Sequence, residues 1–188
     1  MKLSPKLTVR GGSKMKKILV VVDMQKDFIT GSLGTEEAKK IVPNVVKLID
    51  EFDGEIYATL DTHDEDYLNT LEGKKLPVVH CQIGTDGWHL ADEVEEALAK
   101  KQVTMVEKPT FGSVELMGML EDEVEDDEVE FTLCGLCTDI CVVTNSLLLR
   151  AYFPNAVIKV KADCCAGVTP ETHEAALKTM QMCQIDII

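Results

Sequence analysis

Three side chains in this sequence have the types needed for nucleophilic chemistry on an acyl group: Asp23, Lys108 and Cys141. A cysteine can attack the acyl carbon, an aspartate can take the thiol proton and later pass one to a leaving amine, and a lysine can stabilise both negative charges. Each residue also has an ordinary interpretation, as a helix cap, a solvated lysine or a buried thiol. Their chemistry therefore depends on whether the fold brings them together.

The surroundings of Cys141 are the most informative part of the chain. Residues 129–133 alternate apolar and polar side chains and predict a strand, whereas residues 147–152 predict a helix with a buried face. We expect Thr138 to cap that helix and Cys141 to lie in its first turn. There the unpaired N–H groups and the helix dipole favour a thiolate over a thiol. The pattern therefore predicts a nucleophile at a strand-to-helix turn.

The other elements follow from the spacing of apolar residues along the chain. Apolar runs predict strands at 18–22, 56–60, 103–106, 129–133, 157–160 and 185–188, and helical spacing predicts helices at 36–52, 91–100, 113–120, 147–152 and 170–182. This alternation predicts an α/β protein, a three-layer α/β/α sandwich with a central, mostly parallel sheet. In such sheets ligands bind beyond the carboxyl ends of the strands. We therefore expect one crevice to collect the side chains that follow four different strand ends, namely Asp23, Asp61, Lys108 and Cys141.

Composition limits the class of protein and its partners. The 188 residues suffice for one domain with its own core, which we place at residues 15–188, and the basic residues 1–14 are predicted to be an extension outside the fold. A net charge of −14 argues against nucleic acid and anionic membranes as partners. No apolar run approaches the ~20 residues of a membrane span. Seven cysteines without an export signal predict reduced thiols in a cytoplasmic protein.

Three segments around the reactive residues resemble the signatures of one enzyme family. The segments are residues 22–28 (VDMQKDF), 108–113 (KPTFGS) and 135–142 (GLCTDICV). They resemble the D-x-Q-x-D-F opening, the catalytic-lysine segment and the G-x-x-T-D-x-C-V nucleophile signature of the isochorismatase-like cysteine hydrolases, and within them of the nicotinamidases. The resemblance extends over residues 16–188. It implies the isochorismatase-like hydrolase fold and catalytic roles for three residues, Asp23, Lys108 and Cys141.

The same resemblance describes the backbone and the pocket around the nucleophile. It implies a cis peptide bond between Leu136 and Cys137. It also implies an oxyanion hole built from backbone N–H groups near Cys137 and Cys141. The side chains expected to form pocket walls beside the substrate are Phe28 and Trp88.

A second set of residues resembles the metal site of nicotinamidases. Asp61-Thr62-His63 is similar to their D-x-H motif, and residues 77–81 resemble the segment that carries their next metal histidine, here His80. One aspartate with two histidines suits Zn²⁺, Mn²⁺ or Fe²⁺. We expect one divalent ion per chain, with zinc as the first choice. Those enzymes have a fourth ligand between the histidines, for which the candidates are Glu72, at the more similar spacing, and Asp66 or Glu65.

The resemblance as a whole implies a metal-containing cysteine amidase that hydrolyses nicotinamide to nicotinate and ammonia through a thioester. It further implies a small-molecule amide as the partner and a homo-oligomer as the assembly. Two alternatives stay open. One is an amidase of the same family for another small amide, and the other is a non-catalytic redox or metal-binding module that uses the C-x-x-C pair Cys134 and Cys137. Release of ammonia from nicotinamide would separate these alternatives.

Overall fold

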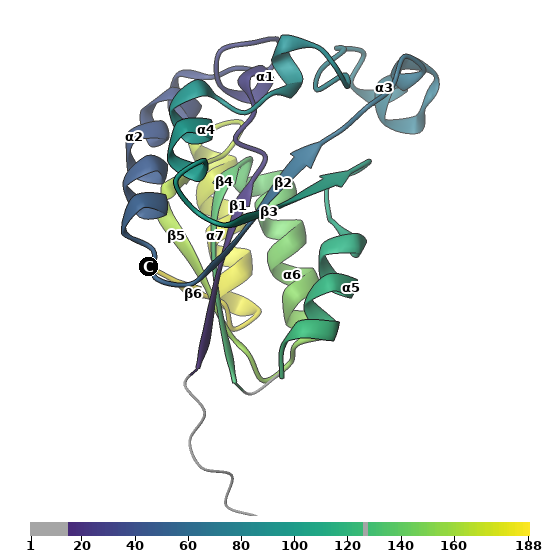
Figure 1. The fold of residues 1–188 in the computed structure, drawn as a ribbon. Helices are drawn as coiled ribbons and strands as arrows, with labels where there is room; N and C mark the ends of the chain where they lie inside the picture. Colours follow the sequence, from purple (N-terminus) through teal and green to yellow (C-terminus); the bar gives the residue numbers. More distant parts are fainter. Residues whose placement is uncertain (1–14, 126–127) are drawn as a thin grey trace, which may run out of the picture.

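A six-stranded parallel sheet forms the centre of the molecule (Figure 1). The computed structural model describes residues 15–125 and 128–188, so the predicted extension at residues 1–14 lies outside the described part. The strand order is β3-β2-β1-β4-β5-β6. The strands are β1 (Lys16–Val22), β2 (Glu55–Asp61), β3 (Val103–Lys108), β4 (Val129–Leu136), β5 (Val157–Ala166) and β6 (Asp186–Ile187). The predicted parallel sheet is confirmed.

Helices cover both faces of this sheet and complete three layers (Figure 1). One face carries α2 (Glu36–Glu51) and α4 (Asp92–Leu98). The other face carries α5 (Val114–Glu123), α6 (Val143–Tyr152) and α7 (Pro170–Met182). Two short helices, α1 (Lys26–Ile29) and α3 (Leu71–Lys75), lie in the connections beyond the strand ends. The predicted α/β/α sandwich is therefore also confirmed.

The strand order reverses between β1 and β4, and this reversal determines where a ligand crevice forms. The chain runs outward from β1 to β3 and then returns to add β4, β5 and β6 on the other side. In open parallel sheets the connections leave opposite faces at such a point, so their ends diverge and leave a crevice. Asp23 directly follows β1, and the loop after β4 leads to Cys141. Both residues therefore lie at the crevice.

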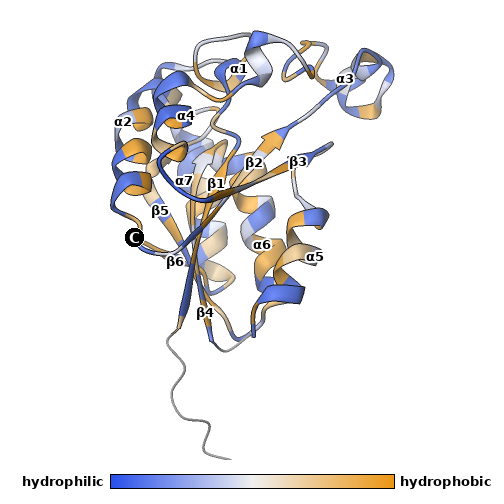
Figure 2. Ribbon diagram, viewed as in Figure 1, coloured by the Kyte–Doolittle hydropathy of each residue, from blue (hydrophilic) through white to orange (hydrophobic). Residues whose placement is uncertain are grey.

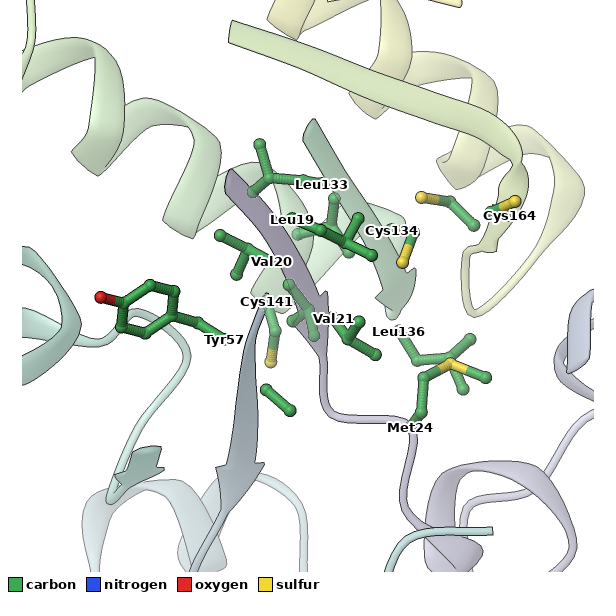
Figure 3. Close-up of a cluster of buried hydrophobic side chains, with 14 of the residues drawn as sticks. Leu19, Val20, Val21, Met24, Tyr57, Leu133, Cys134, Leu136, Cys141 and Cys164 are labelled. Atoms are coloured by element: carbon green, nitrogen blue, oxygen red, sulfur yellow. The ribbon is translucent and has the colours of Figure 1, made fainter. Parts of the chain in front are cut away.

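The core explains why the central strand consists of an uninterrupted apolar run. All five residues from Ile18 to Val22 have no exposed surface, as expected for a parallel strand covered on both faces. Figure 2 shows hydrophobic residues along the strands, whereas helices such as α2 alternate hydrophilic and hydrophobic residues. Figure 3 shows side chains of β1, including Leu19, beside Leu133 and Cys134 of the neighbouring strand β4. In the described part of the chain, none of the helices has the length and apolarity needed to cross a membrane.

The boundary predictions were accurate for some elements and short for others. Helix α7 has the predicted bounds, whereas β5 continues to Ala166 instead of ending at Val160. The polar residues Lys161 and Asp163 interrupt the apolar run, so the local pattern ends early. The strand nevertheless continues, because its pairing with β4 resumes beyond an irregularity and aligns Gly135 with Cys165.

Candidate active site

The carboxyl ends of the strands bring Asp23, Lys108 and Cys141 into one group, here called the Asp–Lys–Cys group. Lys108 Nζ lies 2.7 Å from Asp23 Oδ2 and 3.6 Å from Cys141 Sγ. The three residues are at most 5% exposed. Lys108 Nζ also lies 3.1 Å from Oδ1 of Asp61. The structure thus brings together all four side chains that the sequence pattern places at one crevice.

Burial and neighbouring charges together shift the pKa values of this group. It raises the pKa of Asp23, which the charge of Lys108 opposes and the charge of Asp61 reinforces. Burial also raises the pKa of the Cys141 thiol well above its usual range, and the nearby Asp23 carboxylate adds to this effect. Burial alone would lower the pKa of Lys108, but the negative charges beside its ammonium group, that of Asp23 first, outweigh burial and raise it. The expected resting thiolate at Cys141 is therefore wrong, because desolvation favours the neutral thiol.

Cys141 lies in a π-helical turn, residues Thr138–Val142, which we call the Cys141 turn. The N-cap of this turn is Cys137, which makes no side-chain capping bond. The prediction of Thr138 as the cap is therefore wrong, because the helical turn begins one residue earlier than its polar side chain suggested. The Thr138 hydroxyl instead lies 2.8 Å from Nδ1 of His173. The peptide bond between Leu136 and Cys137 is cis, as the resemblance implied.

Two backbone positions beside the group have conformations that restrict the residue type. Gly135 has a φ of +116°, and a Cβ there would lie 2.0 Å from the carbonyl oxygen of Val22. Only glycine fits such a close approach with this backbone conformation. Asp23 has a φ of 46°, in a left-handed region that aspartate tolerates better than most residues. The junction of β1 and β4 thus fixes the backbone from which the Asp23 side chain extends.

A second group, here called the Asp–His cluster, consists of Asp61, His63 and His80. All three are buried, and their ligand-type atoms lie within 4.8 Å of one another. Oδ2 of Asp61 is 3.0 Å from His63 Nε2 and 3.5 Å from His80 Nε2. His80 Nδ1 lies 2.8 Å from the carbonyl oxygen of Val78, and donation to it leaves Nε2 able to bind a metal ion. This donor set therefore fits a divalent transition-metal ion.

The structure distinguishes among the three candidates for the fourth ligand. Oε1 of Glu72 lies 3.8 Å from Nε2 of both histidines in the Asp–His cluster. Glu65 and Asp66 are exposed, and the Asp66 carboxylate accepts a hydrogen bond from Asn69. Helix α3 begins one residue before Glu72 and is capped by Thr70, which accepts from the backbone N–H of Gly73. Glu72 is thus the acid that the fold presents to the cluster.

Three polar residues that the sequence analysis did not single out hold these groups in place. The Gln25 side chain donates to the carbonyl oxygens of Asp61 and Trp88 and accepts from the N–H of Asp61, each at 2.8 Å. Thr59 donates to Asp23 Oδ1 at 2.7 Å, and Asn145 donates to the Cys141 carbonyl at 2.8 Å. The available signal was weak. It consisted of a glutamine inside the first motif and a threonine between the apolar residues Ala58 and Leu60 of β2.

A cavity of about 230 Å³ opens beside Cys141 and is mostly apolar. Its lining includes Cys141, Asp61, Glu72 and His80, and apolar walls from Phe28, Leu33, Leu76, Phe111, Ile140 and Val168. Trp88 is not among the described residues that line it. Its indole N–H donates to the Thr62 hydroxyl at 2.9 Å, so the structure uses this side chain to join two loops. A larger hollow of about 720 Å³ lies between α1, α2 and the start of α4, away from the reactive side chains.

The C-x-x-C pair does not form a common site. Cys134 has no exposed surface and lies among core side chains on β4 (Figure 3), whereas Cys137 lines the cavity. Burial raises the pKa of both thiols, that of Cys137 to about 12. All seven cysteines, each within the described part of the chain, are free thiols. This arrangement does not resemble a reactive dithiol, in which one thiol has a lowered pKa.

Known proteins are similar to this chain in sequence and in fold. The uncharacterized isochorismatase family protein PncA of Bacillus subtilis (strain 168) is 29% identical over 174 residues, covering 87% of this chain and 93% of the relative. A crystal structure of nicotinamidase/pyrazinamidase PncA from Bacillus subtilis superimposes with a TM-score of 0.79 at 27% identity, covering 92% of this chain and 99% of that chain.

Two further solved structures show the same likeness. The pyrazinamidase/nicotinamidase of Streptococcus mutans UA159 has a TM-score of 0.80 at 26% identity, covering 92% of this chain and 100% of that chain. The pyrazinamidase of Pyrococcus horikoshii, solved in complex with zinc, has a TM-score of 0.74 at 25% identity, with 92% and 98% covered. The model of the isochorismatase domain matches residues 17–188. The chain therefore belongs to the isochorismatase family.

Proposed function

We propose that this isochorismatase-family amidase hydrolyses nicotinamide to nicotinate and ammonia, with Cys141 as the nucleophile. The observation that carries the proposal is the position of Cys141 between a charged Lys108–Asp23 pair and an apolar cavity that also reaches the Asp–His cluster. An apolar cavity suits a small neutral aromatic ring, and the Asp–His cluster provides polar anchoring on one side. The structurally similar proteins described as nicotinamidases or pyrazinamidases support this substrate class.

The proposed first half-reaction begins with a neutral thiol. Asp23 takes the proton of Cys141, and the thiolate attacks the carboxamide carbon. The oxygen of the resulting tetrahedral intermediate is held by backbone N–H groups near Cys137 and Cys141. Asp23 then gives its proton to the amine, the C–N bond breaks, and ammonia leaves a thioester behind. Lys108 stays protonated throughout and stabilises whichever of its neighbours carries the negative charge.

The second half-reaction returns the enzyme to its starting state. Asp23, now ionised, takes a proton from water, and the resulting hydroxide attacks the thioester carbon. The C–S bond breaks, the acid is released and the proton on Asp23 returns to the Cys141 sulfur. The sum is one amide and one water converted to one carboxylic acid and one ammonia. The raised pKa of Asp23 suits this shuttle, because a carboxyl group must accept and release a proton in each cycle.

The Asp–His cluster and Glu72 are proposed to hold one divalent ion, with zinc first and Mn²⁺ or Fe²⁺ as alternatives. When bound, such an ion supplies a Lewis acid for the ring nitrogen of the substrate. Phe28, on α1, is proposed as one of the walls that orient the ring, since it lines the cavity beside His80. Cytoplasmic location stays a prediction from the cysteine content, and homo-oligomeric assembly stays a prediction from the family resemblance.

An amide panel with two cysteine variants tests the proposed function. We expect ammonia release from nicotinamide and pyrazinamide, and a loss of at least about 10³-fold in Cys141→Ala, because the nucleophile is absent. Cys134→Ala removes a buried thiol from the same strand-and-turn segment and is expected to keep most of the activity. Turnover of other small amides without nicotinamide would support a different amidase of the family. Full activity of Cys141→Ala would contradict the cysteine mechanism.

A further inference from the structure

The Cys141 turn is held from outside by a part of the chain that the proposed mechanism does not use. Its N-cap, Cys137, makes no side-chain capping bond, so no capping side chain supports the N-terminal end of the turn. Thr138, the first residue of the turn, is fully buried, and its hydroxyl lies 2.8 Å from Nδ1 of His173 on α7. The contact joins residues 35 positions apart.

A second contact joins the same two regions. The backbone N–H of Val168 donates to both carboxylate oxygens of Asp139, at 3.1 and 3.2 Å. Val168 also lines the cavity beside Cys141. The corner between β5 and α7 is therefore attached to the residue that follows Thr138, and it contributes a wall of the candidate site.

The corner and α7 are themselves packed closely enough to act as one support. A Cβ on Gly167 would lie 2.9 Å from both the Cβ and the backbone nitrogen of His173, so the corner packs directly against α7 at this residue. The N-terminus of α7 is fixed by a capping box, in which Thr169 and Thr172 bond reciprocally. The backbone of His173 is therefore fixed by local contacts that do not depend on its contact with Thr138.

We infer that His173 is a positioning residue, which holds the Cys141 turn through the Thr138 hydroxyl so that the thiol lies next to Lys108 and Asp23. Thr138 and Asp139 lie three and two residues before Cys141 in the same turn, so their contacts fix the backbone that carries the sulfur. A displacement of about 1 Å can lower a rate by about 100-fold when the reacting atoms must meet at a fixed distance. The inference rests on the proposed function only in treating Cys141 as the nucleophile.

Matched pairs of variants test the role of this hydrogen bond. His173→Phe keeps a ring but removes Nδ1, whereas His173→Asn keeps a polar atom near the place of Nδ1. Thr138→Val keeps the shape of the side chain but removes the hydroxyl, whereas Thr138→Ser retains it. Glu174→Gln, at the exposed neighbouring position on α7, serves as the control. Each protein is measured for melting temperature, for kcat and KM with nicotinamide, and for the rate at which iodoacetamide labels Cys141, followed by mass spectrometry.

We expect His173→Phe and Thr138→Val to lower kcat by about 10- to 100-fold while KM changes by less than about threefold. His173→Asn and Thr138→Ser should retain most of kcat, and the double variant Thr138→Val with His173→Phe should be little worse than either single variant. The labelling rate of Cys141 should change in the two disruptive variants and stay at the wild-type value in the conservative ones. A loss in His173→Asn as large as in His173→Phe, or additive losses in the double variant, would overturn the inference.

The labelling rate of Cys141 tests the positioning role independently of the proposed substrate. If the wild-type protein releases no ammonia from nicotinamide, the proposed function fails, but a changed labelling rate in His173→Phe and Thr138→Val still supports the positioning role. If nicotinamide is hydrolysed and neither kcat nor labelling responds to the loss of the hydrogen bond, the positioning role fails and the proposed function stands.

Discussion

The Asp–Lys–Cys group and the Asp–His cluster are adjacent, yet the fold supports them differently. Asp23 follows β1 directly and Lys108 is the last residue of β3, so these two side chains extend from the ends of sheet strands. In the cluster, only Asp61 belongs to a strand, while His63 and His80 lie in the long connection between β2 and α4. The sheet therefore fixes most of the first group, whereas loop contacts fix most of the second.

Asp61 is the residue that joins the two groups. Its Oδ1 lies 3.1 Å from Lys108 Nζ and its Oδ2 lies 3.0 Å from His63 Nε2. Burial alone would raise its pKa, but the contacts with His63 and His80 and the charge of Lys108 outweigh burial and lower it. Gln25 holds the Asp61 backbone on both its N–H and C=O sides. Because the end of β2 fixes Asp61 between the two groups, its one carboxylate serves both of them.

Removing the proton acceptor of the Asp–Lys–Cys group tests whether this group acts as a unit, and it is expected to lower activity more than any other change below. Asp23→Asn keeps the size of the side chain but removes the group that accepts the thiol proton, so we expect ammonia release to fall by at least about 10³-fold. The double variant Asp23→Asn with Cys141→Ala should be little worse than either single variant. Losses that add in the logarithm of kcat would show that the two residues act independently.

Removing metal from the protein tests whether the Asp–His cluster binds substrate through a metal ion or stabilises the fold. Removing metal with a chelator should leave the melting temperature nearly unchanged, because the donor residues come largely from connections outside the sheet. It should raise KM for nicotinamide by at least about tenfold, equivalent to about 1.4 kcal/mol, and raise it much less for benzamide, which lacks the ring nitrogen. Metal content and steady-state kinetics before and after chelation are the measurements.

A matched pair of variants identifies which acid belongs to this site. Glu72→Gln should lose metal affinity by about tenfold or more, whereas Glu65→Gln, at an exposed position in the same connection, should not. In the chelation experiment, unfolding of the metal-free protein would indicate a structural metal. Equal losses of affinity for nicotinamide and benzamide would mean that the metal does not contact the ring nitrogen.

The pKa of the Cys141 thiol is expected to change less than the rates above. The direction of its change in two variants shows whether neighbouring charge or burial controls it. The charge of Asp23 raises the pKa of Cys141 and the charge of Lys108 lowers it, with burial as the largest cause of the raised value. Asp23→Asn should therefore move the midpoint of Cys141 labelling by iodoacetamide to lower pH, and Lys108→Met should move it to higher pH, each by about one unit. Lys178→Met, at an exposed position on α7, is the control. Shifts of the same sign in both group variants would show that altered burial, and not charge, controls the thiol.

Much of the fold was predictable because it depends on local patterns. The apolar run at 18–22 followed by Asp23 predicted a central strand and its end, and α7 has the bounds that its spacing and Pro170 predicted. Parallel strands place their carboxyl ends at one edge, so the convergence of the reactive residues followed from the order of elements. The sequence left three acids as candidates for the fourth metal ligand, because all three lay at plausible spacings between the histidines. Only the distances in the structure favour Glu72 among them.

Hydrophobic periodicity predicts the order of strands and helices and the strand ends that the reactive side chains follow, because it is a property of neighbouring residues. The tertiary structure sets the protonation of Cys141, since desolvation depends on everything packed around the sulfur. It also decided that Thr138 bonds to His173, that Trp88 joins two loops, and that Glu72 reaches the histidines. These outcomes depend on side chains meeting across distant parts of the chain, and no local pattern specifies which distant partner a polar side chain will find.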